Sequence, residues 1–103
     1  MNIGSSLPSI PCIIHSLNKA YKEDYTHINR LLMLRMLTNL LASNVSIKYG
    51  FKGPLLSPTM ACATGLNSIG DSYRLIKNNE VDIMICGGSE NSVHPLVYHS
   101  MNK

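Results

Sequence analysis

The sequence lacks tryptophan, contains a single phenylalanine and has only three cysteines among its 103 residues. Cys12, Cys62 and Cys86 cannot all pair and show no CxxC spacing, which argues against a disulfide scaffold and favours free thiols in a reducing compartment. The four histidines show no metal-ligand spacing with any cysteine. No metal site is therefore expected.

Charge of one sign and long apolar runs are also scarce. Charged residues make up 15% of the sequence and the net charge is +3, with no cluster of basic residues, so no nucleic-acid-binding surface is expected. The richest apolar stretch, residues 31–42, is interrupted by Arg35, Thr38 and Asn39 and is far shorter than the roughly 18 residues that a membrane span needs. Residues 1–8 have neither a cationic segment nor a long apolar one, so no signal peptide is evident.

The composition that is present, 45% hydrophobic with seven glycines and five prolines, excludes a disordered tail, a collagen-like chain and a coiled coil. The hydrophobic pattern predicts an α/β order of helices and short strands. The expected elements are a strand end and loop over 1–11, a helix over 12–21, a connection over 22–29, a helix over 31–49, a turn over 49–54, a short buried or edge strand over 55–60, a helix over 62–78, a buried parallel strand over 81–86 that ends at residues 87 and 88, and a helix that opens at Pro95.

The helix expected over 62–78 has two notable features. Its large apolar residues fall on one side, and two glycines interrupt it near its start. These apolar residues are Leu66, Ile69, Tyr73 and Ile76. Because Gly65 and Gly70 would each cost about 1 kcal/mol in an exposed helix, the glycines predict close packing inside a larger core.

Cys62 is the strongest candidate for a chemical role. It lies in the segment ACATG, residues 61–65, between an expected strand and an expected helix. The positive end of the helix dipole and the unpaired N–H groups there favour the thiolate, which is the nucleophilic form. A backbone N–H at the same point can help to stabilise an oxyanion. The alternative is a buried cysteine that acts as a small hydrophobic residue.

The other cysteines and the histidines have simpler interpretations. Cys86 lies in an apolar strand pattern and is expected in the core, and Cys12 follows Pro11 with no partner pattern. All four histidines are expected on the surface or in loops; they are His15, His27, His94 and His99.

Several segments together resemble one family, the β-ketoacyl-acyl-carrier-protein synthases of fatty acid synthesis. They are NVSIKYGFKGP (44–54), ACATG (61–65), SIGD (68–71), VDIMICGGSE (81–90) and SVHPL (92–96). Ile3-Gly4-Ser5 is similar to a strand end upstream in that family. The ACATG form resembles the fatty-acid condensing enzymes more than polyketide synthases or thiolases. The similarity extends from about residue 28 to residue 96 and occurs in register.

The resemblance implies a thiolase-like layered α-β-α-β-α fold that is usually homodimeric. It implies that Cys62 accepts an acyl chain from the phosphopantetheine arm of acyl carrier protein, and that decarboxylation of a malonyl-carrier then drives chain elongation. It implies no metal and no other cofactor. Residues 1–103 are accordingly expected to be part of the N-terminal half of a synthase domain, incomplete at both ends.

The sequence also departs from the family pattern. The family uses two histidines and a lysine downstream of the nucleophile, and neither His94 nor His99 matches those motifs. The 103 residues alone are therefore expected to be inactive. A basic pair that many members carry is replaced by Thr26 and His27. Further departures are Arg30 and Leu34 in place of prolines and Ser43 in place of a helix glycine.

Two functions follow from these residues. The chain belongs to a fatty-acid condensing enzyme that uses acyl carrier protein, or it is a non-catalytic remnant that binds acyl carrier protein or a synthase subunit. The resemblance favours a mitochondrial location, with a plastid or, in a bacterium, the cytoplasm as alternatives.

Overall fold

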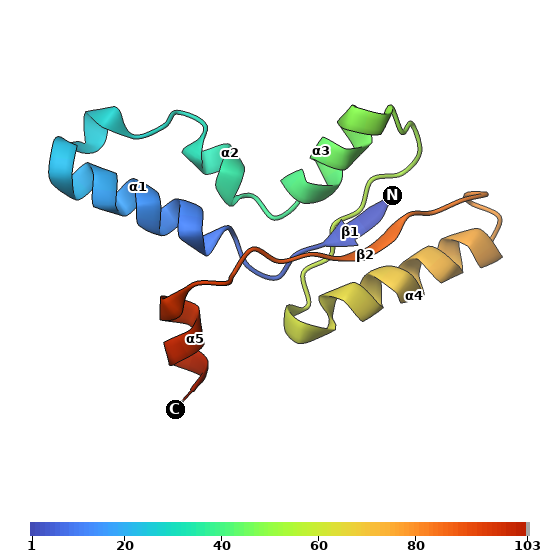
Figure 1. Ribbon diagram of the computed structural model, residues 1–103. Helices are drawn as coiled ribbons and strands as arrows, with labels where there is room; N and C mark the ends of the chain where they lie inside the picture. Colours follow the sequence, from blue (N-terminus) through green and yellow to red (C-terminus); the bar gives the residue numbers. More distant parts are fainter. Residues whose placement is uncertain (103) are drawn as a thin grey trace. The chain divides into compact units, whose positions relative to one another are not determined.

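The computed structural model describes residues 1–102 and shows helices together with a small parallel sheet (Figure 1). Its elements in chain order are β1 (Asn2–Gly4), α1 (Ile10–Glu23), the 3₁₀ helix η1 (Tyr25–His27), α2 (Leu32–Met36), α3 (Leu40–Tyr49), the 3₁₀ helix η2 (Ala61–Ala63), α4 (Thr64–Lys77), β2 (Cys86–Gly88) and α5 (Pro95–Met101). The α/β class predicted from the sequence is therefore confirmed.

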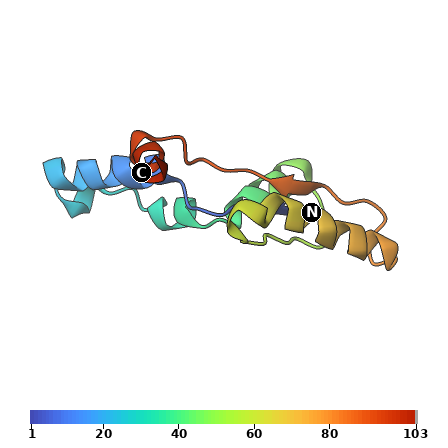
Figure 2. The ribbon, with the colours of Figure 1, turned by 90° about the horizontal axis from the view of Figure 1, so that it is seen from below.

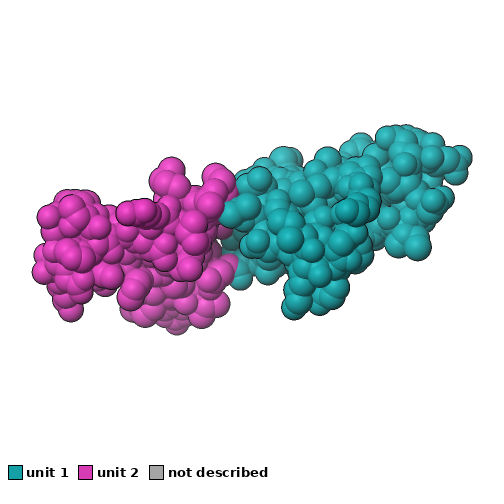
Figure 3. All heavy atoms as spheres, turned by 90° about the horizontal axis from the view of Figure 1, so that it is seen from above, with its two compact units in different colours: residues 1–6, 38–90 teal, residues 7–37, 91–103 magenta. Residues whose placement is uncertain are grey.

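The chain divides into two compact units (Figure 3). The first unit comprises Met1–Ser6 and Thr38–Glu90 and contains the sheet, α3 and α4. The second unit comprises Leu7–Leu37 and Asn91–Lys103 and contains α1, α2 and α5. The segment ACATG and the sheet thus belong to the same unit.

The sheet consists of β1 and β2, which pair in parallel with Asn2 opposite Cys86 and Gly4 opposite Gly88. The parallel arrangement agrees with the sequence prediction, but the predicted strand over 81–86 is wrong, because of these residues only Cys86 belongs to β2. The ladder starts at Asn2, which lies opposite Cys86 and donates its N–H to the Ile85 carbonyl at 2.8 Å. Residues 81–84 precede this first pair, and Ile83 is 86% exposed. Cys86 itself is exposed, so its expected place in the core is also wrong.

The strand predicted over 55–60 does not form. Only an isolated bridge between Asn2 and Leu56 occurs there, in which the Leu56 N–H donates to the carbonyl of Met1 at 2.9 Å. Pro54 and Pro58 lie on either side of Leu56, and each lacks the N–H that a longer ladder would need.

The single helix predicted over 31–49 is also wrong, because the structure has α2 and α3 there instead. The break begins at Leu37, whose backbone is extended (φ −75°, ψ 122°). Thr38 and Asn39 follow, and both residue types are poor helix formers. The predicted end of the helix is confirmed, since Gly50 closes α3 in the left-handed conformation with φ 68°.

The predictions for the first and last helices agree with the structure. The helix expected over 12–21 lies within α1, which is longer by two residues at each end, and α5 begins at Pro95 as expected. The expected connection over 22–29 contains the short η1. The expected strand end near the start of the chain is β1.

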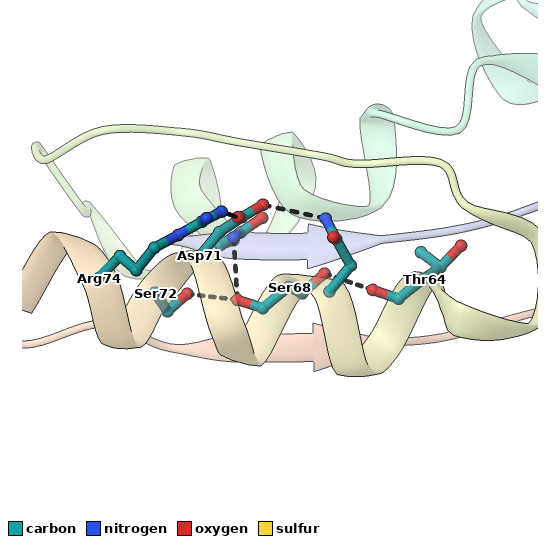
Figure 4. A network of polar contacts seen from close by, with 7 residues as sticks. Thr64, Ser68, Asp71, Ser72 and Arg74 are labelled. Atoms are coloured by element: carbon teal, nitrogen blue, oxygen red, sulfur yellow. Dashed lines mark hydrogen bonds and ion pairs between the residues drawn. The ribbon is translucent and has the colours of Figure 1, made fainter.

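Helix α4 runs along both strands of the sheet and opposite to their direction, as Figures 2 and 4 show. It does not use its large apolar side for this contact, because Leu66 is 75% exposed. Instead it buries a row of small hydroxyl residues at positions 64, 68 and 72, with exposures of 4%, 0% and 2%. Each hydroxyl in the helix interior bonds the preceding turn: Ser68 Oγ donates to the Thr64 carbonyl at 3.0 Å, and Ser72 Oγ donates to the Ser68 carbonyl at 2.7 Å.

These small residues let the helix approach the sheet closely. The buried side-chain amide of Asn2 in β1 donates from Nδ2 to the carbonyl of Ser68 at 3.0 Å. A β-carbon on Gly88 would come within 3.1 Å of the α-carbon of Gly65. The prediction of close packing is confirmed at Gly65, whereas a β-carbon on Gly70 would meet open space.

Candidate functional site

A hollow of about 300 Å³ lies where the carboxyl ends of β1 and β2 meet the N-terminal end of α4. Gly4 ends β1 and Gly88 ends β2, and both line the hollow. The complete lining is Gly4, Ser5, Ser6, Ala61, Cys62, Thr64, Gly65, Gly88, Ser89 and Glu90. In α/β proteins this edge of a parallel sheet is the usual place for a ligand.

The Cys62 side chain is exposed and lines this hollow. Its backbone lies in η2, and α4 starts only at Thr64, so the prediction that the helix begins at Cys62 is wrong by two residues. The reason is the conformation of Ala61, whose φ of 47° is left-handed and cannot be part of a right-handed α-helix. Cys62 therefore occupies a tight turn directly before the helix, where the positive end of the helix dipole lies.

The turn at Ala61 is strained, and hydrogen bonds hold it. For an L-residue other than glycine, the left-handed conformation costs about 1–2 kcal/mol. Thr64 Oγ1 donates to the Ala61 carbonyl at 2.7 Å, and Ser6 Oγ donates to the same oxygen at 2.6 Å. The Met60 N–H donates to Thr64 Oγ1 at 2.8 Å. Strain of this kind is concentrated at functional sites, where the surrounding structure fixes an otherwise rare backbone conformation.

A carboxylate joins the two segments that follow β1 and β2. Glu90 follows β2, and its Oε1 accepts from Ser5 Oγ at 2.9 Å while its Oε2 accepts from the Ser6 N–H at 3.1 Å. The Ser89 N–H donates to the Gly4 carbonyl at 3.1 Å. These bonds fix residues 5 and 6 after β1 against the segment that follows β2.

Glycine at position 4 is required for the wall of the hollow. A β-carbon there would lie 2.3 Å from the Pro58 carbonyl oxygen and 2.3 Å from Thr64 Cγ2, which are distances that no real contact allows. The backbone of β1 therefore touches the turn that leads to Cys62, and the three segments of the hollow form one packed arrangement.

The structure does not bring the other sequence candidates to this hollow. Cys12 is half-buried in α1 of the second unit, and Cys86 lies at the start of β2 and does not line the hollow. His94 caps α5 by accepting from the Leu96 N–H at 3.1 Å. No group of three or more histidine, cysteine or acid residues within 1–102 could hold a metal ion. No helix in the same range is both long and apolar enough to cross a membrane.

Sequence reasoning missed Ser6, Thr64 and Glu90 as parts of the site. One signal could have found two of them. Ser6 and Glu90 each lie two residues after the end of a strand, and the carboxyl ends of neighbouring parallel strands meet at one edge of a sheet. Thr64 stands within the ACATG segment, where its hydroxyl could have been considered beside the thiol.

Residues 6–103 match the family model described as the N-terminal domain of beta-ketoacyl synthase. Because the match covers nearly the whole sequence, the chain belongs to the β-ketoacyl synthase family. The resemblance inferred from the sequence motifs is thereby confirmed. The parallel sheet with its helices agrees with the thiolase-like fold that the resemblance implies.

Individual relatives are similar over most of the chain. A "3-oxoacyl-[acyl-carrier-protein] synthase homolog" of Saccharomyces cerevisiae is 43% identical over 94 residues, which are 91% of this chain and 21% of the relative. The mitochondrial 3-oxoacyl-[acyl-carrier-protein] synthase of Arabidopsis thaliana is 34% identical over 96 residues, which are 93% of this chain and 21% of the relative. The 3-oxoacyl-[acyl-carrier-protein] synthase 2 of Coxiella burnetii is 36% identical over 94 residues, which are 91% of this chain and 23% of the relative. The chain thus spans about a fifth of the length of these relatives.

Proposed function

We propose that this chain carries the acyl-accepting nucleophile of a 3-oxoacyl-[acyl-carrier-protein] synthase, an acyltransferase of fatty acid synthesis, and that Cys62 is that nucleophile. The single observation that carries the proposal is the position of Cys62 in a chain of this family. Its thiol is exposed and lies in the wall of a hollow, on a strained turn at the N-terminal end of α4. A nucleophile needs such access and such a fixed orientation.

The reaction would begin with thioester exchange at Cys62. The thiolate attacks the carbonyl carbon of an acyl thioester on the phosphopantetheine arm of acyl carrier protein, and the carrier thiolate leaves. Negative charge develops on the carbonyl oxygen during the attack, and the backbone N–H of Cys62 is proposed as one of its donors. The acyl group is then bound to Cys62 and the carrier thiol is free.

The second half of the reaction would lengthen the chain by two carbons. Malonyl-carrier loses carbon dioxide, and the carbanion that remains attacks the Cys62 thioester. The carbon–sulfur bond breaks with its electron pair on sulfur, so the Cys62 thiolate is restored and a 3-oxoacyl-carrier leaves. The groups that promote decarboxylation are proposed to come from residues outside these 103, since neither His94 nor His99 lines the hollow. No metal or other cofactor is proposed for either half.

Acyl carrier protein is the proposed partner, and a homodimer is the proposed assembly. The names of the relatives support the carrier, because each names an acyl-carrier-protein synthase. A mitochondrial location is proposed on the similarity to the Arabidopsis thaliana protein.

Transfer of an acyl group onto Cys62 tests the proposal. The protein expressed from its complete gene is mixed with acyl carrier protein that has an acyl chain on its phosphopantetheine arm. Mass spectrometry of the peptides of the protein then locates the transferred acyl group. We expect one acyl group on Cys62, its loss in Cys62→Ser, and wild-type transfer in Cys86→Ser, which replaces the other exposed cysteine. Binding of the carrier without acylation of Cys62 would instead identify a non-catalytic remnant.

A further inference from the structure

We propose that Thr64 is a positioning residue for Cys62 and that Ser6 shares this task. Their two hydroxyls hold the carbonyl of Ala61 and thereby hold the turn that presents the thiol. The inference rests on the proposed function of Cys62. Thr64 would affect the reaction without contacting the substrate, because its hydroxyl is bonded to the turn that carries Cys62.

The hydroxyl of Thr64 makes two hydrogen bonds in this turn, one as donor and one as acceptor. Its proton goes to the Ala61 carbonyl at 2.7 Å, and it accepts the Met60 N–H at 2.8 Å. Its oxygen also lies 3.0 Å from Ser6 Oγ. A hydroxyl has one proton, and the protons of Thr64 and Ser6 both go to the Ala61 carbonyl, so this 3.0 Å approach of two oxygens is not a further hydrogen bond. The residue is 4% exposed, and its bonds join the N–H of Met60, directly before the left-handed Ala61, to the carbonyl of Ala61 itself.

Ser6 comes to the same carbonyl from the other end of the unit. Its Oγ donates to Ala61 at 2.6 Å, and its backbone N–H donates to Glu90 Oε2 at 3.1 Å. The carboxylate therefore fixes the backbone of Ser6 so that its side chain can reach the turn. The clamp, which we define as Ser6, Thr64 and Glu90, thus joins the segments after β1 and β2 to the start of α4.

The consequence for chemistry follows from the position of Ala61 directly before Cys62. When the clamp is lost, Ala61 can relax toward an ordinary right-handed or extended backbone. The peptide that carries Cys62 would turn with it, and the thiol would leave its place in the hollow. A misplacement of about 1 Å at a reacting group can cost about 100-fold in rate. The effect should fall on the rate of acyl transfer and not on the affinity for the carrier, which Thr64 at 4% exposure can hardly touch.

Four variants in the protein from the complete gene separate this role from a merely structural one. Thr64→Val removes the hydroxyl at almost constant volume, and Thr64→Ser keeps the hydroxyl. Ser6→Ala removes the second donor from a less buried residue. Ser43→Ala is the matched control, because it removes a serine hydroxyl that donates to the Asn39 carbonyl at 3.0 Å in α3.

The measurement is the rate of Cys62 acylation at increasing concentrations of the acylated carrier protein. We expect Thr64→Val to lower the limiting rate at least tenfold with an unchanged half-saturating concentration. Thr64→Ser should stay within about threefold of the wild type, Ser6→Ala should fall by a factor of about three to ten, and Ser43→Ala should not change. A second readout is alkylation by iodoacetamide, with Cys86 in the same molecule as internal reference. The Cys62 rate should change in Thr64→Val while the Cys86 rate does not.

The possible results decide the proposal. Wild-type acylation in folded Thr64→Val would overturn it, and so would an equal loss in Thr64→Val and Thr64→Ser, which would indicate packing and not the hydroxyl. If Thr64→Val does not fold, wild-type behaviour of Ser6→Ala overturns the clamp. If the wild-type protein is not acylated at all, the proposed function fails, and the alkylation ratio of Cys62 to Cys86 alone decides whether the clamp positions the thiol.

Discussion

Gly65 and Gly88 are in backbone contact, since a β-carbon on Gly88 would lie 3.1 Å from the α-carbon and 3.3 Å from the nitrogen of Gly65. The contact joins the first turn of α4 to the last residue of β2. It brings the helix end close to the sheet edge, and the hollow beside Cys62 forms there.

Replacement of Gly88 by alanine should destabilise the fold. The new methyl group would press on backbone atoms of Gly65, which cannot turn aside as a flexible side chain can, and such overpacking costs about 1–3 kcal/mol. Gly70→Ala is the control, because a β-carbon there meets nothing within 4 Å and alanine favours a helix by about 0.5–1 kcal/mol. Urea unfolding curves measure the free energy of unfolding of both variants. A Gly88→Ala variant as stable as the wild type would show that the helix can move away freely.

Replacement of Gly50 by alanine should also destabilise the protein, for a conformational reason alone. Gly50 closes α3 at φ 68°, and no atom would lie within 4 Å of a β-carbon there. The cost is therefore the left-handed penalty of about 1–2 kcal/mol. Gly53→Ala has equally open space without a positive φ, and should be neutral or slightly stabilising. Equal unfolding midpoints for the two variants would contradict this explanation.

A cerulenin-like epoxide should label Cys62 in the protein from the complete gene. The thiol is exposed and lines the hollow, so an electrophile can reach it. Peptide mass spectrometry should find the adduct on Cys62 and not on Cys86, although Cys86 is exposed as well. A label on Cys12 or Cys86 with Cys62 untouched would remove Cys62 from the proposed role.

The 103 residues expressed alone should not elongate an acyl chain. Cys62 lines the hollow, but no histidine or lysine does, and the groups that promote decarboxylation are proposed to lie outside these residues. The assay supplies acyl-carrier protein and malonyl-carrier protein and follows the 3-oxoacyl product by mass spectrometry. The same assay on the protein from the complete gene is the positive control. A 3-oxoacyl product from the 103 residues alone would show that they contain the whole active site.

The sequence predicted which segments are helices better than it predicted which segments pair as strands. Helices α1 and α5 could be predicted because their apolar spacing and prolines act locally. The strand at Cys86–Gly88 could not, because a strand needs a neighbour and the position of β1 decides where the ladder begins. An apolar run such as 81–86 shows a preference for burial, not a pairing register.

The same limit applies to α4 and to the site. The spacing of Leu66, Ile69 and Tyr73 correctly places them on one side of a helix, but the side that packs on the sheet carries Ser68 and Ser72. Cys62 could be predicted as a candidate because its segment has a recognisable local form, and its catalytic role stays a prediction. Ser6 and Glu90 were not assigned to the site, although each lies two residues after a strand end, because the pairing of β1 with β2 that brings the two positions together was not predicted.

The long reach of the clamp has a consequence for how the protein folds. Its bonds join Ser6 to Ala61 across 55 positions and Ser6 to Glu90 across 84. Contacts between such distant positions form slowly, because a long loop must close before they are made. We therefore expect the turn before α4 to become rigid only after both strands have paired. Until then we expect Cys62 to be a flexible thiol that can react with oxidants and electrophiles from any direction. In the folded protein the turn fixes the direction from which a reagent reaches the thiol.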